Sequence, residues 1–365
     1  MKVVTIGGAM LDSIAIIDSD RIERMAMRNA DSSFLLLEEG RKTEAIEIST
    51  HCGGGAVNTA VAMARLGCDV SVVVKLGQDT RADQILTRLA EEGVSTRWVM
   101  RDANAPTGAS VMISSHERDA AIFTFRGANT LLRADDLKPD MFEVDLVYIS
   151  SLSNESADCF PELVRASKRP GALVATNPGI RQLSTRADSF HDCLASIDVL
   201  SINTIEADAL VPQLVARFGE GGPALPLKAD ETPPALVARG LSSGGFEMTL
   251  SAFVSALTEI GLSHVVITAG AEGAYVGSGD GIRYCPTLPA EIHGTAGAGD
   301  AFGSTFAALS ALGCSIDEAL LSATINASSV VGHADTQSGL LTRDALEQQK
   351  TSLDAGALIR HWPQP

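Results

Sequence analysis

The feature that most constrains the fold is a regular alternation of short apolar runs and helical patterns in the middle of the chain. Residues 146–149, 173–176 and 199–202 are apolar and rich in strand-forming side chains, and residues 158–168 have helical spacing. Strands that alternate with helices predict a mostly parallel sheet with helices on its faces. We therefore expect an α/β protein of three layers, in which ligands bind at the carboxyl ends of the strands.

Two strand pairs interrupt this alternation. Residues 13–18 and 45–50 form the first pair, and a piece with helical spacing at 21–28 separates them. Residues 107–115 and 120–126 are typical of a hairpin and are more polar than the core strands. We expect these pairs to form a small sheet that stands over the main one.

The segment 212–245 breaks the pattern in another way. It is rich in Pro, Gly, Ala and acidic residues, lacks clear periodicity and is long for a connection within a domain. We interpret it as a surface insertion, partly disordered, in a single domain that spans residues 1–365.

Composition excludes several classes of function. The net charge of -17 argues against a nucleic-acid partner, because no basic surface can replace the counterions of a polyphosphate chain. No segment reaches the length of a membrane span, so no membrane is expected as a partner. The six cysteines form no C-x-x-C pair, which favours reduced thiols and predicts a cytoplasmic protein.

A glycine-rich turn at 294–300 leads into an apolar helical segment that ends near Ala311. Gly297, Ala298 and Gly299 would let a ligand approach the backbone N–H groups of a helix N-terminus, which is an anion site. Asp300 lies in that first turn, where the helix dipole favours an ionised carboxylate that can accept a proton from a hydroxyl. The turn therefore suggests phosphoryl transfer to an alcohol, although an ordinary loop with a helix-capping acid is also compatible with it.

Other polar residues follow predicted strands or open predicted helices. Asp12 comes just after the first strand, where a substrate can meet it or where it serves a turn. The glycines at 53–55, including Gly54 and Gly55, precede Asn58, which can bind a polar ligand in both directions or cap a helix.

A second group of polar residues follows the predicted strands at 199–202 and 264–268. Asn203 and Glu206 have the spacing of a capping box, and Glu206 can also face a magnesium-bound water. Thr268 and Gly270 can border a nucleotide or mark a plain turn after a strand.

Taken together, these pieces resemble the ribokinase (PfkB) family of sugar and nucleoside kinases along nearly the whole chain. GGGAVNTAVAMARLG at 53–67 is similar to the N-terminal signature of the family, and TAGAGD at 295–300 to the C-terminal one. Shorter matches in the expected order are Asp12, residues 107–108, 127–129 and 177–179, Asn203 to Glu206, and residues 268–270.

The resemblance implies a fold, an activity and a set of roles. The fold would be a central, mostly parallel sheet flanked by helices, with a small β lid formed by about 13–51 and 95–128 that closes over the substrate. The activity would be ATP- and Mg²⁺-dependent phosphorylation of a hydroxyl, and the lid could also mediate a homodimer. The implied roles are a base at Asp300, amides for the phosphoryl group at Gly297, Ala298 and Gly299, substrate contacts at Asp12, Gly54, Gly55 and Asn58, ATP contacts at Asn203, Thr268, Gly270 and Gly273, and Mg²⁺ placement at Glu206.

Some positions depart from the family pattern. Gly294 and Ala296 replace residues that many members carry at the start of the second signature, which argues against a carried-over monovalent-cation site. Met10 occupies a position that is polar in true ribokinases, so a sugar or polyol other than ribose is expected as acceptor. A nucleoside kinase of the same fold and a catalytically silent sugar-binding protein are the alternatives.

Two further classes of protein lack their motifs in this chain. P-loop kinases are excluded because the chain has no P-loop sequence. A dinucleotide-dependent enzyme is discounted because no G-x-G-x-x-G follows the first strand.

Overall fold

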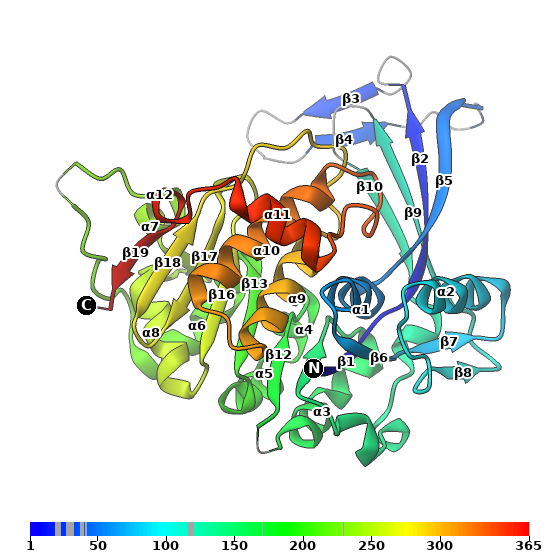
Figure 1. Ribbon diagram of the computed structural model, residues 1–365, viewed down its shortest axis with the longest axis horizontal. Coiled ribbons are helices and arrows are strands. Elements are labelled where there is room, and N and C mark those ends of the chain that lie inside the picture. Colours follow the sequence, from blue (N-terminus) through cyan, green and yellow to red (C-terminus); the bar gives the residue numbers. More distant parts are fainter. Residues whose placement is uncertain are drawn as a thin grey trace.

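The computed structural model describes residues 1–18, 23–26, 33–36, 40, 42–115, 120–169, 171–228 and 230–364. A large sheet lies between two layers of helices, and a smaller sheet stands beside it (Figure 1). The predicted three-layer α/β architecture with a separate small sheet is confirmed. No helix in these described ranges is long and apolar enough to cross a membrane.

The large sheet is parallel over most of its width. Its strand order is β19-β18-β17-β16-β13-β12-β11-β1-β6, and only the pairs from β16 to β19 are antiparallel. Because the parallel strands point the same way, their carboxyl ends share one edge. The strands are β1 Lys2–Ile6, β6 Asp69–Val73, β11 Leu146–Ile149, β12 Leu173–Thr176, β13 Val199–Asn203, β16 His264–Thr268, β17 Ala274–Ser278, β18 Gly281–Cys285 and β19 Arg360–Pro363.

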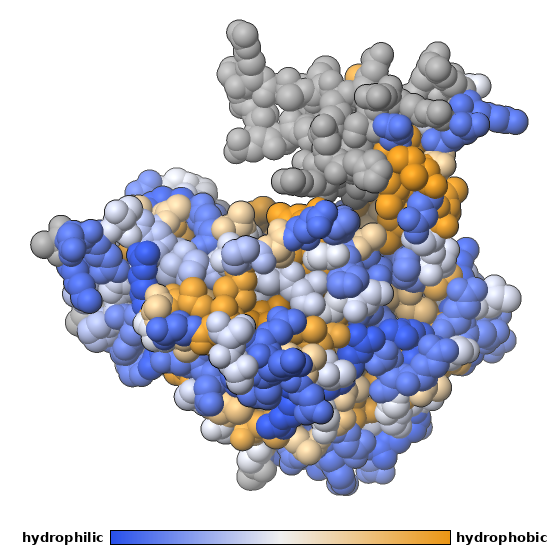
Figure 2. Space-filling view, turned by 45° about the horizontal axis from the view of Figure 1, so that its top comes forward, coloured by the Kyte–Doolittle hydropathy of each residue, from blue (hydrophilic) through white to orange (hydrophobic). Residues whose placement is uncertain are grey.

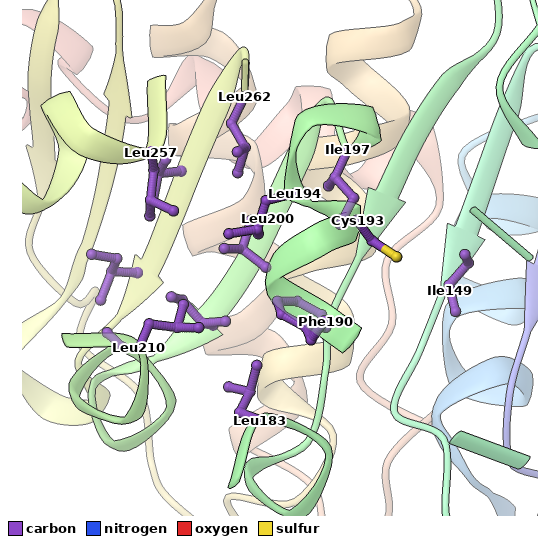
Figure 3. Packing of buried hydrophobic residues seen from close by; sticks show 14 of the residues in the cluster. Ile149, Leu183, Phe190, Cys193, Leu194, Ile197, Leu200, Leu210, Leu257 and Leu262 are labelled. Carbon is purple, nitrogen blue, oxygen red and sulfur yellow. The ribbon is translucent and has the colours of Figure 1, made fainter. Parts of the chain in front are cut away.

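The sheet is covered on both faces because its strands carry apolar side chains at consecutive positions. Neighbouring residues of a strand point to opposite faces, so Val147 joins one buried cluster and Tyr148 the other. Figure 3 shows the first cluster, in which Phe190, Leu194 and Leu200 pack between strands and helices. Its helices are α3 Phe160–Ser167, α4 Ile180–Thr185, α5 Ala187–Cys193, α6 Thr204–Phe218, α7 Ala235–Arg239 and α8 Leu250–Ile260.

The opposite layer contains the two helices that open at the candidate site, α1 and α9. These two helices contact each other, and α9 also packs along α10. The layer and the C-terminal helices are α1 Gly55–Arg65, α2 Thr80–Glu91, α9 Ala298–Ala311, α10 Ile316–Val331, α11 Arg343–Thr351 and α12 Ala355–Leu358.

The small sheet has the order β10-β9-β2-β5 and overlaps the two predicted lid segments, beginning at Met10 in β2 and ending at Gly53 in β5, slightly beyond the predicted bounds. Strand β2 runs parallel to β9, and its other neighbour β5 is antiparallel to it. The chain enters this sheet directly from β1 and returns through β5 into α1. Residues 116–119, the turn of the predicted hairpin, lie outside the described residues. The strands are β2 Met10–Ile17, β5 Ala45–Gly53, β9 Gly108–Ser115 and β10 Ala120–Phe125.

The helical spacing predicted at 21–28 was wrong where the structure describes it. Residues 23–26 form strand β3, Glu23–Ala26, which pairs with β4, Ser33–Leu36. A short polar stretch gains little from helix formation alone, and pairing with β4 satisfies its backbone instead. The other short pairs are β7 Lys75–Gly77 with β8 Met100–Asp102, and β14 Leu241–Ser243 with β15 Phe246–Met248.

The predicted insertion at 212–245 needs a correction in its first part. Residues 212–218 continue helix α6, with Pro212 inside the helix. Further along, Leu225, Leu236 and Leu241 are buried in the core cluster shown in Figure 3. Composition hid these contacts, because single leucines spaced far apart give no periodic signal. The surface character and partial disorder of the remaining segment stay predictions.

Candidate active site

The predicted site residues come from strand ends and helix starts at one edge of the large sheet. Asn203 ends β13 and lies directly opposite Thr268, which ends β16. Helices α1 and α9 begin at the same edge and contact each other. The structure therefore brings Asn58, Asp300, Asn203 and Thr268 to one edge, as expected for ligand binding in an open α/β sheet.

The turn before α9 requires glycine at Gly297. This residue caps the helix with a φ of 82°, in the left-handed region, and a Cβ there would lie 2.7 Å from Cβ of Thr336. Gly299 is exposed, and a Cβ on it would meet nothing within 4 Å. The first N–H groups of a helix have no partner within it. The turn thus offers an accessible backbone surface suited to an anion.

Asp300, the predicted base, is held by Asn58. Asn58 Nδ2 donates a hydrogen bond of 2.8 Å to Asp300 Oδ2. Burial raises the pKa of Asp300, this hydrogen bond lowers it, and the charge of Asp12 raises it, with a net increase. The helix dipole favours the ionised carboxylate, whereas desolvation acts in the opposite direction. A carboxylate with a raised pKa is a better proton acceptor near neutral pH.

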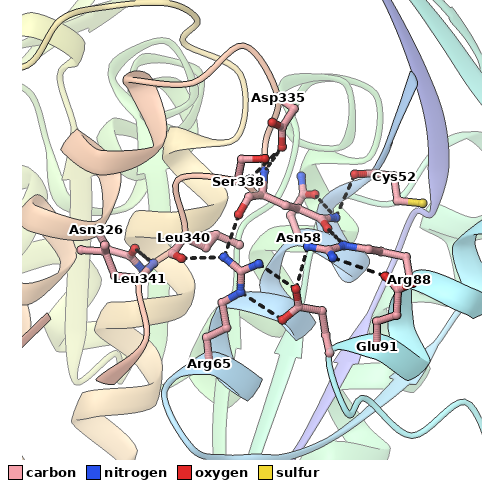
Figure 4. A network of polar contacts seen from close by, with 12 residues as sticks. Cys52, Asn58, Arg65, Arg88, Glu91, Asn326, Asp335, Ser338, Leu340 and Leu341 are labelled. Carbon is pink, nitrogen blue, oxygen red and sulfur yellow. Dashed lines mark hydrogen bonds and ion pairs between the residues drawn. The ribbon is translucent and has the colours of Figure 1, made fainter. Parts of the chain in front are cut away.

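Asn58 is itself fixed by residues that sequence reasoning missed. Thr336 Oγ1 donates 2.9 Å to Asn58 Oδ1, and Gln337 Nε2 donates 3.2 Å to the same oxygen. Gln337 Nε2 also donates to the backbone oxygen of Cys52, as part of the network in Figure 4. These contacts assign the amide orientation of Asn58, so its Nδ2 faces Asp300. The signal in the sequence was a polar run, 335–338, between two glycines.

A network of charges anchors this C-terminal segment to α1 and α2 (Figure 4). Arg65 donates from Nη1 to the backbone oxygens of Gln337 and Leu340 and contacts Glu92 through Nε and Nη2. Arg88 Nη2 lies 2.6 Å from the same carboxylate, and its Nε donates to Gln337 Oε1. Arginines of α1 and α2 therefore hold Gln337, which in turn holds Asn58.

Asp12 projects from the inner face of the small sheet. It is 7% exposed, and Ser110 Oγ of the neighbouring strand donates to its Oδ1. Burial raises the pKa of Asp12, while Ser110 and the nearby His51 lower it, with a net increase. A Cβ at Gly53 would lie 2.0 Å from Asp12 Oδ2. The glycine thus leaves room for this carboxylate beside α1.

Gly54 and Gly55 have steric reasons to be glycine. Gly54 has a φ of 94°, and a Cβ there would lie 2.6 Å from the backbone oxygen of Gly8. A Cβ at Gly55 would lie 2.8 Å from Cβ of Ser150 and 3.6 Å from Asp300 Oδ1. The close approach of α1 to the ends of β1 and β11 explains both residues, and their substrate contacts stay a prediction.

Asn203 and Glu206 form the capping box that their spacing indicates. Asn203 Oδ1 accepts from the Glu206 N–H at 2.9 Å, and Glu206 Oε2 accepts from the Asn203 N–H at 3.0 Å. The pKa of Glu206 is raised to about 7, because burial and the charge of Asp300 raise it more than the contacts to Asn203 lower it. Two carboxylates therefore repel each other at this edge, which favours a cation between them.

The described residues contain no group of three or more His, Cys, Asp or Glu that could hold a metal by themselves. Magnesium is commonly bound by one or two carboxylates with substrate phosphates and water. Glu206 and Asp300 supply two carboxylates whose charges interact at this edge, and such a pair fits a partial site of this kind.

Of the residues predicted to line an ATP site, Thr268, Gly270 and Gly273 lie around the turn between β16 and β17, and Asn203 lies opposite Thr268 at the end of β13. Thr268 Oγ1 is 3.5 Å from the backbone oxygen of Ile202, and a Cβ at Gly270 would meet nothing within 4 Å. Gly273 has a φ of 105°, and a Cβ there would lie 2.3 Å from the backbone oxygen of Cys285. Packing against β18 accounts for Gly273, whereas Gly270 leaves open space.

Tyr148 is a further polar group beneath the site that the sequence did not indicate. Its ring is fully buried on β11, and its hydroxyl has no hydrogen-bond partner among the described residues. Burial and the charges of Asp300 and Glu206 raise its pKa well above the usual value. Gly303 of α9 gives it space, since a Cβ there would lie 2.5 Å from its oxygen.

Comparisons with proteins of known sequence and structure agree on one family. The chain is 24% identical over 328 residues to deoxyribokinase of Salmonella typhi, covering 89% of this chain and 94% of the relative. It is 26% identical over 306 residues to ribokinase of Bacillus subtilis, covering 81% and 86%.

Solved structures show the same fold. A putative ribokinase II from E. coli matches with a TM-score of 0.73 at 18% identity, over 97% of this chain and all of that one. Arabidopsis thaliana ribokinase, complexed with ribose and ATP, matches with a TM-score of 0.68 at 22% identity, over 95% and 97%.

The model of the family described as pfkB family carbohydrate kinase matches residues 12–228 and 241–343. These ranges include Asp12, Asn58, Glu206 and Asp300. The chain therefore belongs to the pfkB family of carbohydrate kinases, which are phosphotransferases with an alcohol group as acceptor.

Proposed function

We propose that this protein catalyses the ATP- and Mg²⁺-dependent phosphorylation of a hydroxyl on a small sugar or sugar-like polyol. The observation that carries the proposal is the hydrogen bond of 2.8 Å that aims Asn58 at Asp300, at the accessible start of α9. It supports a base beside an anion site, which is what phosphoryl transfer to an alcohol requires.

In this mechanism Asp300 would accept the proton of the acceptor hydroxyl while the oxygen of that hydroxyl forms a bond to the transferred phosphorus. The bond between this phosphorus and the rest of the donor would break, and ADP would leave. The N–H groups at Gly297, Ala298 and Gly299 stabilise the charge on the transferring group. ATP supplies that group when bound, and Mg²⁺ neutralises its charge. Asn203 and Glu206 would hold the metal and its waters, while Thr268, Gly270 and Gly273 would border the nucleotide. Two similar solved structures are complexed with ATP, one of them also with Mg²⁺, and this supports ATP as donor and Mg²⁺ as the metal.

On the acceptor side, Asp12 and Asn58 supply a charged acceptor and a mixed donor and acceptor, a pairing suited to adjacent hydroxyls. Gly54 and Gly55 would let the substrate approach the backbone. Met10 places an apolar side chain at the base of the same strand as Asp12, which favours a sugar or polyol other than ribose.

The test is a coupled assay of ADP release over a panel of sugars, polyols and nucleosides. We expect turnover that depends on both the acceptor and Mg²⁺, with a sugar or polyol other than ribose preferred. If nucleosides alone release ADP, the nucleoside alternative replaces this proposal. If a sugar of the panel binds in calorimetry but no acceptor releases ADP, the chain is a silent sugar-binding protein.

We also propose that the small sheet closes over the substrate and mediates a homodimer. Its outward face carries Ile48, Val111, Phe123 and Phe125, which are 72%, 46%, 60% and 53% exposed. Figure 2 shows hydrophobic residues at the upper right, where Figure 1 places this sheet. Exposed apolar patches of this kind favour association. Sedimentation should give a dimer for the wild type and a monomer for Phe123→Glu, and a monomeric wild type would contradict this.

We place the protein in the cytoplasm. All six of its cysteines are described and free, which suits a reducing compartment. Cell fractionation with an antibody to the chain tests this assignment.

A further inference from the structure

A cavity of about 650 Å³ opens at the carboxyl ends of β11 and β12. This is a volume typical of small-molecule sites. Its walls include Arg126 after β10, Ser151 and Ser153 after β11, and Arg181 and Gln182 of α4. None of these residues has a role in the phosphoryl-transfer site described above.

Two arginines in this cavity lack a carboxylate partner among the described residues. Arg126 is half-buried, and its Nη1 donates to Ser153 Oγ. Burial lowers the pKa of Arg126, and the charge of Arg181 lowers it further, so the two guanidinium groups repel each other. By contrast Arg186, on the same wall, pairs with Asp158 through Nε at 2.6 Å.

The carboxylate in the lining, Glu155, does not neutralise this pair. It is exposed, and its Oε2 lies 3.7 Å from Arg133 outside the cavity. Two neighbouring guanidinium groups without a counter-ion destabilise the protein, and a bound oxyanion removes that cost through charge-assisted hydrogen bonds. Arginine is also the side chain whose planar donors match carboxylate and phosphate oxygens.

An unsatisfied donor in the same wall points to the same kind of ligand. Gln182 is 2% exposed, and its Oε1 accepts from the Leu152 N–H at 3.4 Å. This contact orients the amide, and Nε2 is left buried without a partner among the described residues. A buried donor without an acceptor is unfavourable, so the cavity favours a ligand that brings an acceptor oxygen.

The cavity is linked to the Asp300 site through two consecutive serines. A Cβ at Gly55 would lie 2.8 Å from Cβ of Ser150 and 3.6 Å from Asp300 Oδ1. The next residue, Ser151, lines the cavity, where a Cβ at Gly179 would lie 3.1 Å from Cβ of Ser151. Consecutive residues at the end of β11 thus border the Asp300 site and the cavity, which makes the two places neighbours at the strand ends.

We propose that Arg126, Arg181 and Gln182 form an oxyanion subsite for the acceptor, so that the preferred substrate is an acidic sugar rather than a neutral one. The inference rests on the proposed kinase function and adds the chemical class of its acceptor. The oxyanion is a carboxylate, as in an aldonic acid, or a phosphate ester at the far end of the sugar. Both present oxygens that arginine and amide donors recognise.

The experiment matches each neutral sugar with its aldonic acid and with its terminal phosphate ester. ADP release gives kcat and KM for each member of a set, and calorimetry gives the dissociation constant without turnover. The proteins are the wild type, Arg181→Gln, Gln182→Leu and, as a control that removes a charge outside the cavity, Arg343→Gln at the start of α11. Arg181 is exposed, so its variant is expected to fold.

We expect the wild type to prefer one anionic member of a set over its neutral partner. Arg181→Gln should raise KM and the dissociation constant for that member roughly 10- to 100-fold and leave kcat, and the constants for the neutral sugar, nearly unchanged. Gln182→Leu should have a smaller effect of the same kind. Preference for the aldonic acid or for the phosphate ester identifies the oxyanion.

Two outcomes separate this inference from the proposed function. If neutral sugars turn over best, or if Arg181→Gln weakens neutral and anionic acceptors alike, the subsite is overturned and the kinase function stands. If anionic sugars bind in an Arg181-dependent way but no acceptor releases ADP, the subsite stands and the kinase function fails.

Discussion

Asn58 and Asp300 are 242 residues apart in the chain and are joined by a hydrogen bond of 2.8 Å from Nδ2 to Oδ2. The bond links the first turn of α1 to the first turn of α9. The second carboxylate oxygen, Oδ1, has no hydrogen-bond partner among the residues that the structure describes, and a Cβ at Gly55 would lie 3.6 Å from it. A side chain at position 55 would contact that oxygen, so glycine leaves this side of it open to an acceptor hydroxyl.

Asp300→Asn tests the base. The variant keeps the shape of the side chain and an oxygen for Asn58 but cannot accept a proton, so kcat should fall by about 10²–10⁴-fold with little change in acceptor binding. Steady-state kinetics and calorimetry measure the two quantities. A kcat near that of the wild type would contradict the role of Asp300.

Glu206→Gln tests the metal role against the cap. An amide oxygen can still accept from the Asn203 N–H and therefore preserves the capping box, but it holds metal-bound water less well. The Mg²⁺ concentration for half-maximal rate should rise several-fold, measured by titration at saturating ATP. If only the melting temperature falls, Glu206 serves the helix alone.

Asp12→Ala should reduce kcat/KM severely, because buried polar groups of the site and of the substrate would lose their partner. Ser110→Ala is the matched control, since it removes the hydrogen bond to Asp12 but keeps the carboxylate, and it should have a much smaller effect. Met10→Asn should shift selectivity toward a more hydroxylated acceptor. An Asp12→Ala enzyme with wild-type kcat/KM would refute the substrate contact.

Glu92→Gln should lower the melting temperature at neutral pH. The hydrogen bonds from Arg65 lower the pKa of Glu92, burial raises it, and the charges of Arg65 and Arg88 lower it, so the net pKa lies below 4.5. The ionised carboxylate therefore stabilises the fold above pH 4.5, and this contribution is lost as pH falls through the lower pKa of the folded state.

The expected loss at pH 7 is about 1–3 kcal/mol, and the difference from the wild type should shrink below pH 4.5. Thermal unfolding over a pH series measures it. Glu91→Gln is the control, because Glu91 is 61% exposed and makes a single, longer ion pair of 3.6 Å with Arg88. Equal effects of the two variants would show that charge number alone matters.

Leu236→Ala tests whether the segment after α6 belongs to the core. Leu236 is fully buried in the cluster around α6 and α8, so its truncation should cost about 2–5 kcal/mol with kcat retained below the melting temperature. Leu227→Ala, at a position 38% exposed, should cost much less. Chemical denaturation with activity measurements gives both values, and equal losses would contradict the difference in packing.

The strands that were predicted best are those with continuous apolar runs. Residues 146–149, 173–176 and 264–268 were placed with their observed bounds, because burial on both faces leaves a signal in the sequence itself. Strands β18 and β19 were missed. They form an antiparallel edge around Arg283 and Trp362 and do not repeat the strand and helix alternation.

The candidate site divides in a similar way. Asp300 and Asn58 were found because glycines beside a helix start are visible as a local pattern. Thr336, Gln337, Ser110 and Tyr148 were not found, since each acts through a partner far away in the chain. The pKa of Asp300 was also beyond sequence reasoning, because its direction depends on burial.

The contacts of Thr336 and Gln337 with Asn58 have a consequence for synthesis of the protein. During translation α1 leaves the ribosome long before residues 336–337, which complete the hydrogen bonds to Asn58 Oδ1. Contacts between segments so far apart form late and slow the folding of a domain. Until then the amide of Asn58 is free to rotate, so a nascent chain that already contains α9 and Asp300 still lacks an oriented site.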